Sequence, residues 1–137
     1  MYIPTTTATT YSVIFVCMGN ICRSPTAHGV FRHKLLHSGL MEQVSVDSAG
    51  THNYHPGKAP DERTQRHAAQ RGYDLSNLRA RQVLPEDFER YDMVLAMDWD
   101  NLALLQELCP TRHAFKVRRM TEFCQQFDGP VVPDPYY

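Results

Sequence analysis

The segment Cys17-Met18-Gly19-Asn20-Ile21-Cys22-Arg23-Ser24 has the form C-x5-R-S. A cysteine thiolate is a strong nucleophile, and the planar guanidinium of an arginine bonds two phosphoryl oxygens at once. The pattern therefore predicts a phosphate-handling site with Cys17 as the nucleophile and Arg23 as the phosphate clamp. The remaining residues of the segment are assigned to substrate binding: Met18, Gly19, Asn20, Ile21, Cys22 and Ser24.

The segments on either side of this loop are those that a phosphate-binding loop needs. Ser12–Val16 is mostly apolar, as in a strand buried on both faces of a parallel sheet. Ser24 as the N-cap and Pro25 after it favour the start of a helix. A loop that wraps at a helix N-terminus points backbone N–H groups inward, and the helix dipole adds about half a positive charge there. These donors, with the Ser24 hydroxyl, favour a thiolate on Cys17.

Strand-like and helix-like segments alternate along the rest of the chain. Strands are expected at 43–48, 92–97 and 114–117, and helices at 24–38, 61–71, 85–90 and 98–108. Alternation of this kind implies crossover connections and a parallel sheet, with the site at the carboxyl ends of the strands. We therefore predict a doubly wound α/β fold whose phosphate-binding loop joins the first strand to the first helix.

The length of 137 residues fits one domain. We expect a disordered N-terminal extension over residues 1–11 and a single domain over 12–137. The extension is rich in threonine and carries no charged side chain, so it lacks the basic start of a signal peptide. No apolar run approaches the ~20 residues of a membrane span. We therefore expect a cytoplasmic protein.

Charge and composition exclude several other classes of function. The 14 Lys and Arg residues nearly balance the 15 Asp and Glu residues, so neither nucleic acid nor a membrane is an expected partner. The four cysteines and seven histidines lack metal-ligand spacing, and we expect no metal. The loop also lacks the Gly-Lys-[Ser/Thr] end of an ATP-binding loop. Because Arg23 and backbone amides supply the positive charge, we expect no cofactor.

These motifs resemble those of the low-molecular-weight protein tyrosine phosphatase family. Val16–Pro25 is similar to the signature loop of that family, and the likeness runs from Ser12 to the last residue. Further similar stretches are Asp47–Thr51, Leu78–Val83, Leu95–Asp98, Asn101-Leu102 and Val132–Tyr137. The resemblance implies a four-stranded parallel sheet flanked by helices.

The resemblance also implies a reaction and the residues that perform it. It is the hydrolysis of phosphotyrosine in proteins, and of small aryl phosphates, through a phosphocysteine on Cys17. Asp134 is implied as the general acid and base, which makes chemical sense because the leaving phenol has a pKa near 10 and needs a proton. Tyr54, Tyr136 and Tyr137 are implied as walls of the substrate pocket.

The implied partner is a tyrosine-phosphorylated protein, with a tyrosine kinase among the candidates, and phosphate or another oxyanion is the implied ligand of the loop. The protein is expected to be a monomer or weak dimer. A reversible disulfide between Cys17 and Cys22 is implied as protection of the nucleophile from overoxidation. Family members continue past the Asp-Pro-Tyr-Tyr motif into a helix that packs on the sheet. We expect an exposed apolar sheet face if this chain ends at Tyr137.

Three other functions are compatible with parts of this pattern. Arsenate reductases share the fold and loop but need relay cysteines, and Cys109 and Cys124 lie in other segments than that relay pair. Phosphoarginine phosphatases carry a threonine where this chain has Ile21. A phosphopeptide-binding module without activity is the third, and the presence of every catalytic position argues against it.

Overall fold

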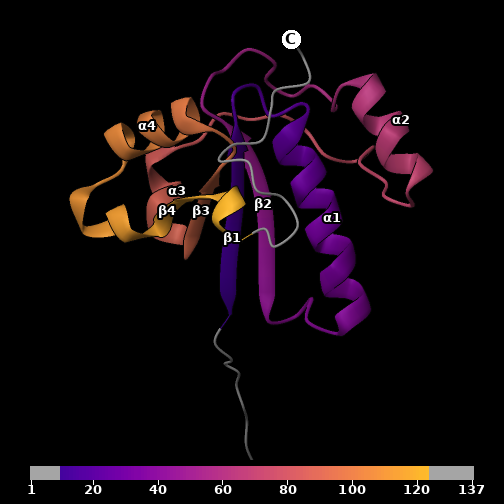
Figure 1. The fold of residues 1–137 in the computed structure, drawn as a ribbon, viewed down its shortest axis with the longest axis horizontal. Coiled ribbons are helices and arrows are strands. Elements are labelled where there is room, and N and C mark those ends of the chain that lie inside the picture. Colours follow the sequence, from indigo (N-terminus) through magenta and orange to yellow (C-terminus); the bar gives the residue numbers. More distant parts are fainter. Residues whose placement is uncertain (1–9, 124–137) are drawn as a thin grey trace, which may run out of the picture.

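The structure, a computed structural model, describes residues 10–123. Its elements in chain order are β1 (Tyr11–Cys17), α1 (Arg23–Ser38), β2 (Val44–Gly50), α2 (Glu62–Gln70), α3 (Pro85–Arg90), β3 (Met93–Ala96), α4 (Trp99–Leu108), the 3-10 helix η1 (Thr111–Lys116), β4 (Val117–Arg119) and the 3-10 helix η2 (Met120–Phe123) (Figure 1). Most of the expected N-terminal extension lies outside the described residues, as do Cys124, Asp134, Tyr136 and Tyr137. Within the described range, no helix has the length and apolar composition needed to cross a bilayer.

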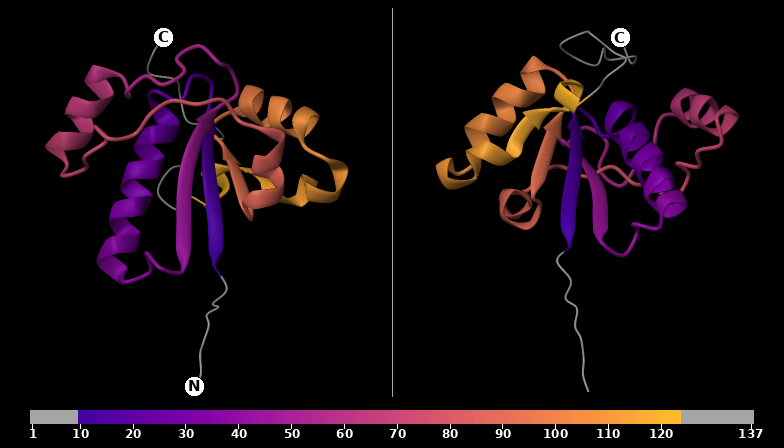
Figure 2. Two further views of the ribbon diagram at one scale, coloured as in Figure 1. Left: turned by 180° about the vertical axis from the view of Figure 1, so that it is seen from behind. Right: turned by 60° about the horizontal axis from the view of Figure 1, so that its bottom comes forward.

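The four strands form one parallel sheet in the order β2-β1-β3-β4. β1 is central: Phe15 lies opposite Ser48 of β2 on one side and opposite Leu95 of β3 on the other. Its continuous run of buried side chains over 13–17 is the pattern expected of a strand covered on both faces. The two views of Figure 2 show β1 and β2 side by side with helices around the sheet. The predicted fold class is confirmed.

Side chains alternate between the two faces of each strand and so build two cores. The core toward α3 and α4 contains Ile14, Val16, Ala49, Val83, Phe88, Tyr91, Val94, Ala96, Leu105 and Val117. The core toward α1 contains Val13, Phe15, Cys17, Leu95 and Met97, with partly buried Ala27 and Phe31 of α1 packed on it. Cys17 therefore ends β1 with its side chain on the α1 side, directly below the start of that helix.

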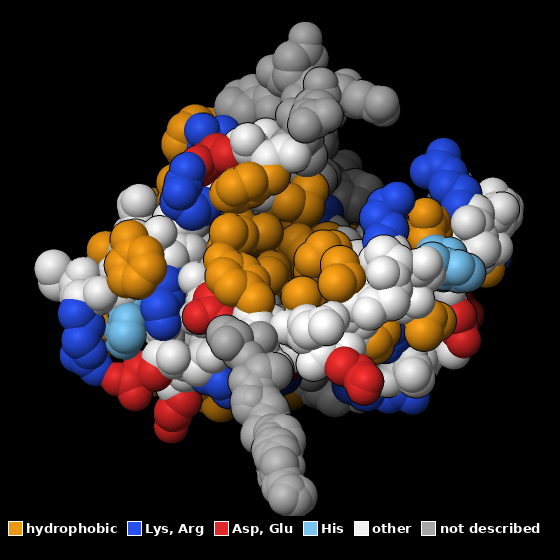
Figure 3. Space-filling view, turned by 90° about the horizontal axis from the view of Figure 1, so that it is seen from below, with side chains coloured by type: hydrophobic (Ala, Val, Ile, Leu, Met, Phe, Trp, Pro, Cys, Tyr) orange, Lys and Arg blue, Asp and Glu red, His pale blue; other side chains and the backbone are white. Residues whose placement is uncertain are grey.

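The α1 face also carries an open apolar groove of about 760 Å³. Val13 and Leu95 of the sheet line it, together with Met97 just after β3, Phe31 of α1 and Phe123 of η2. Figure 3 shows the hydrophobic side chains gathered on this side of the molecule. Within residues 10–123, this face is less completely covered than the face that packs on α3 and α4.

Two of the expected elements differ from the structure. The first helix begins at Arg23, with Cys22 at the N-cap, so the prediction that Ser24 is the N-cap is wrong. The Ser24 hydroxyl instead forms hydrogen bonds with Cys17 Sγ and the Asn20 side chain beneath the loop. The strand expected over 114–117 is also wrong, because residues 111–116 form η1 and β4 begins at Val117. Phe115 is 72% exposed, so its apolar side chain does not mark a buried strand.

Candidate active site

The loop between β1 and α1 closes tightly because of one residue. Asn20 adopts a left-handed backbone conformation with φ of 59°, which asparagine tolerates better than most residues. Its side-chain oxygen accepts a hydrogen bond from the backbone N of Arg81 at 3.0 Å. Its side-chain nitrogen donates to Ser24 Oγ at 2.8 Å. Asn20 therefore joins the loop both to α1 and to the segment that contains Arg81.

The Cys17 thiol lies among hydrogen-bonding groups at the N-terminus of α1. Its Sγ is 3.1 Å from Ser24 Oγ and accepts a bond from the Asn20 backbone N at 3.3 Å. Because Ser24 Oγ already accepts a bond from Asn20, its own hydrogen is available to donate to Cys17 Sγ or to the Ala49 carbonyl oxygen, 3.3 Å away. Donors arranged in this way stabilise a thiolate.

The Arg23 guanidinium is held by a carboxylate from another element. Arg23 Nη1 donates to Asp98 Oδ2 at 2.7 Å, and the Arg23 side chain is only 4% exposed. Asp98 Oδ1 accepts a bond from the backbone N of Asn101, also at 2.7 Å. Asp98 is the N-cap of α4. Asp98 therefore caps α4, and the same carboxylate also orients the arginine of the loop.

The end of β2 packs closely against the loop. The backbone N of Thr51 donates to the Cys17 carbonyl oxygen at 2.8 Å, and the backbone N of His52 donates to the Met18 carbonyl oxygen at 3.0 Å. A Cβ at Gly50 would lie 2.7 Å from the Met18 carbonyl oxygen, so only glycine allows this approach. No side chain caps the N-terminus of α1, and the amides of its first turn are therefore suited to an anion.

An ion-pair network supports the loop from behind. The Arg81 side chain donates to Asp47 Oδ2 at 3.0 Å and to Asp87 Oδ2 at 2.9 Å. Burial lowers the pKa of Arg81, but the bonds to Asp87 and Asp47 outweigh it and the pKa lies above its ordinary value. Since the Arg81 backbone also bonds to Asn20, this network fixes the loop. Sequence reasoning missed it, although the stretches Asp47–Thr51 and Leu78–Val83 were noticed as motifs.

An aromatic group forms the rim beside the loop. The Tyr54 side chain is 59% exposed, and its ring stacks on His52 with centroids 4.9 Å apart. His55 meets the Tyr54 ring edge-on, and its Cδ2 lies 3.1 Å from the position of a Cβ on Gly19. Tyr54 therefore lies near the loop, while the two histidines were not singled out from the sequence. The only sequence signal for them was a loop rich in histidine.

The structure brings together the site residues predicted over 17–24 and places Tyr54 on an adjoining loop. Ile21 and Cys22 are buried with Ala80 in a small apolar cluster. Cys17 and Cys22 are both free thiols. Asp134, Tyr136 and Tyr137 lie outside the described residues. In the described part of the chain, no group of three or more His, Cys, Asp or Glu side chains is placed to hold a metal ion.

The fold and the loop define a doubly wound α/β protein with a cysteine, an arginine and a helix N-terminus at its first strand–helix junction. A family model described as low molecular weight phosphotyrosine protein phosphatase matches residues 12–137. The low molecular weight protein-tyrosine-phosphatase of Streptomyces coelicolor is 46% identical over 131 residues, which are 93% of this chain and 79% of that protein. The protein-tyrosine-phosphatase YfkJ of Bacillus subtilis is 37% identical over 126 residues, 92% of this chain and 81% of that protein.

A solved crystal structure of a protein tyrosine phosphatase also matches this chain. The crystal structure of a protein tyrosine phosphatase from Entamoeba histolytica, with Hepes in the active site, matches with a TM-score of 0.90 and 39% identity. The match covers 93% of this chain and 81% of that one. The chain belongs to the low molecular weight phosphotyrosine protein phosphatase family, as the motifs predicted. It is a protein tyrosine phosphatase, a hydrolase.

Proposed function

We propose that this enzyme hydrolyses phosphotyrosine in proteins, and small aryl phosphates, through a phosphocysteine intermediate on Cys17. One observation carries the proposal. Cys17 Sγ lies 3.1 Å from the Ser24 hydroxyl and 3.3 Å from the Asn20 amide, at a helix N-terminus that no side chain caps. This environment favours both a thiolate and the negative charge of a phosphoryl group beside it.

The reaction has two steps. The Cys17 thiolate attacks phosphorus, the bond from phosphorus to the tyrosine oxygen breaks, and Asp134 donates a proton to the leaving phenolate. Water then attacks the phosphocysteine, Asp134 takes a proton from that water, and the phosphorus–sulfur bond breaks to release phosphate and the thiolate. Arg23, oriented by Asp98, and the loop amides bind the phosphoryl oxygens. The role of Asp134 rests on the resemblance of residues 132–137.

The substrate ring is assigned to a pocket walled by Tyr54, Tyr136 and Tyr137. The stacking of Tyr54 on His52 beside the loop supports its part in this wall. Hepes in the active site of the Entamoeba relative carries a sulfonate, which supports phosphate and other oxyanions as ligands of this loop. Ile21 packs in an apolar cluster, which supports phosphotyrosine over phosphoarginine because the phosphoarginine enzymes carry threonine there.

The proposed partner is a tyrosine-phosphorylated protein, and a tyrosine kinase is among the candidates. In this proposal the enzyme acts as a monomer or weak dimer. It acts in the cytoplasm, because a thiolate nucleophile needs a reducing compartment. Cys17 and Cys22 are both buried within one short loop. Their reversible disulfide remains part of the proposal as a protection of the nucleophile.

Phosphate release from a phosphotyrosine peptide in excess EDTA tests this function. We expect turnover by the wild type and none by Cys17→Ser. Loss of a general acid lowers the rate by a factor of about 10²–10⁴. The rate of phosphate release by Asp134→Asn should therefore be at least ~100-fold lower than that of the wild type. Turnover by Cys17→Ser, or a wild type that is folded and inactive, would refute the proposed mechanism.

A further inference from the structure

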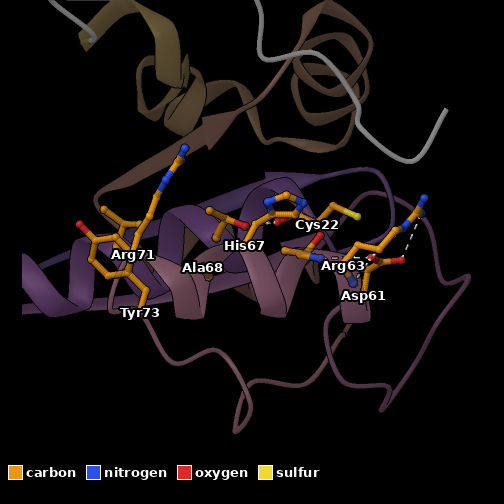
Figure 4. A pocket seen from close by; sticks show the side chains of 10 residues that line it. Cys22, Asp61, Arg63, His67, Ala68, Arg71 and Tyr73 are labelled. Carbon is orange, nitrogen blue, oxygen red and sulfur yellow. Dashed lines mark hydrogen bonds and ion pairs between the residues drawn. The ribbon is translucent and has the colours of Figure 1, made fainter.

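A second pocket lies between α1 and α2, next to the phosphate-binding loop. Its volume is about 420 Å³, and Cys22 and Val30 line one side of it. Arg63 and His67 of α2, and Arg71 just after that helix, line the other side. Figure 4 shows Arg71, His67 and Arg63 in this order along α2, with the Cys22 sulfur near the Arg63 end.

The three basic side chains form a stripe because of their spacing. Residues four apart on a helix lie on one face, and eight residues rise by about 12 Å. All three are exposed. Arg63 pairs with Asp61 at 3.4 Å, while no ion pair forms on the Arg71 side chain within the described range. The pocket lining carries two arginines and one carboxylate, so these side chains give it a positive charge in a chain whose net charge is −1.

The stripe starts at the phosphate-binding loop itself. The backbone N of Asp61, the N-cap of α2, donates to the Ile21 carbonyl oxygen at 2.9 Å. Arg63 follows two residues later, so the stripe runs outward from the loop toward Arg71. An extended peptide spans about 3.3 Å per residue. Residues a few positions from a phosphotyrosine bound in the loop therefore reach the stripe.

We propose that this pocket binds acidic side chains that flank the phosphotyrosine of a protein substrate. The inference rests on the proposed function, because the phosphotyrosine must occupy the loop for its neighbours to reach α2. Arg63 and Arg71 bond the carboxylates. The apolar lining of Val30, Ala68 and Tyr73 contacts the aliphatic stems of the glutamates. The enzyme thus prefers phosphotyrosines that lie in acidic segments.

The test compares kcat/KM for two phosphotyrosine peptides of equal length, one with glutamates at the positions around the phosphotyrosine and one with alanines. An exposed ion pair changes affinity by a factor of about two to five. With two arginines involved, we expect the wild type to prefer the acidic peptide by roughly tenfold at low salt, and less at high salt. Arg63→Glu/Arg71→Glu removes the preference, and Arg63→Gln/Arg71→Gln reduces it.

Controls separate this inference from the proposed function. Arg112→Glu makes the charge change of one of these two substitutions at an exposed site outside the pocket and should keep the preference. p-Nitrophenyl phosphate has no flanking residues, so all these variants should hydrolyse it like the wild type. A wild type that turns over p-nitrophenyl phosphate and both peptides equally overturns the inference and leaves the proposed function standing. The inference is also overturned if the double variant loses kcat/KM for both peptides by the same factor. Absence of all turnover instead defeats the proposed function.

Discussion

Asp98 allows a test of how the phosphate clamp is held. One oxygen of Asp98 accepts from Arg23 and the other accepts from the backbone of Asn101, each at 2.7 Å. Asparagine at this position keeps an acceptor for the helix cap but removes the negative charge beside Arg23. A hydrogen bond to a charged group contributes about 1.5–3 kcal/mol, and a helix N-cap about 1 kcal/mol. We expect Asp98→Asn to lower the free energy of unfolding by about 1–2 kcal/mol, and Asp98→Ala by about 3 kcal/mol because it removes both bonds.

The catalytic effect follows from the same contact. Arg23 is 4% exposed and Asp98 23% exposed at the side chain, so solvent screens this pair only partly. If the loosened guanidinium costs 1.4–2.8 kcal/mol of transition-state stabilisation, kcat/KM falls by about 10- to 100-fold. The inhibition constant for inorganic phosphate should rise as well, because phosphate uses the same clamp.

Steady-state hydrolysis of p-nitrophenyl phosphate, with phosphate as a competitive inhibitor, measures both effects. Urea unfolding of the same proteins reports their stability. Asp100→Asn is the matched control, because Asp100 is an exposed acid in the first turn of the same helix. A folded Asp98→Asn protein with the kcat/KM and phosphate inhibition of the wild type would refute the idea that Asp98 orients Arg23.

Three further substitutions test other parts of the site. Ser24→Ala removes the hydroxyl 3.1 Å from Cys17 Sγ. We expect slower alkylation of Cys17 by iodoacetate at neutral pH and about tenfold lower kcat. Alkylation at the wild-type rate would contradict the role of the Ser24 hydroxyl. Burial lowers the pKa of His28 from 6.5 to about 4, so the unfolded chain binds more protons between these values. Stability therefore falls by about 2–3 kcal/mol as the pH drops through this window, and His28→Gln should flatten that slope in urea unfolding at pH 7 and 4.5; equal slopes would speak against it. Gly50→Ala forces a Cβ to 2.7 Å from the Met18 carbonyl oxygen. It should lower the free energy of unfolding by about 2 kcal/mol in urea unfolding. An unchanged midpoint would show that the loop moves aside to accommodate the Cβ.

The first strand, the loop and the first helix were predictable because local patterns and chemistry agree there. The mostly apolar run over 12–16 predicts a strand, and the structure buries residues 13–17. Asn20 suits the left-handed turn that the loop needs. The boundary error at Ser24 has a chemical cause. A serine at this point satisfies the usual preference for an N-cap, but its hydroxyl bonds instead beneath the loop, beside Cys17.

The support of the loop was not predictable in the same way. Arg81 is 34 residues from Asp47 and 61 residues from Asn20 along the chain. These groups meet because β2 pairs with β1 and because Gly50 forms an isolated parallel bridge with Gln82. No periodicity or turn signal encodes such a contact, since it depends on which strands become neighbours. The same holds for Asp98, which reaches Arg23 only because β3 pairs with β1.

Three distant segments hold the loop through backbone bonds. Arg81 N donates to the Asn20 side chain, Asp61 N donates to the Ile21 carbonyl oxygen, and His52 N donates to the Met18 carbonyl oxygen. Because these bonds hold three of the loop residues, the amides and the thiol need little reorganisation when charge develops on a phosphoryl group, which is the condition for effective electrostatic catalysis. The tie from Asp61 also connects the loop directly to the basic stripe of α2. We therefore expect that an acidic segment bound on that stripe also influences the orientation of the substrate in the loop.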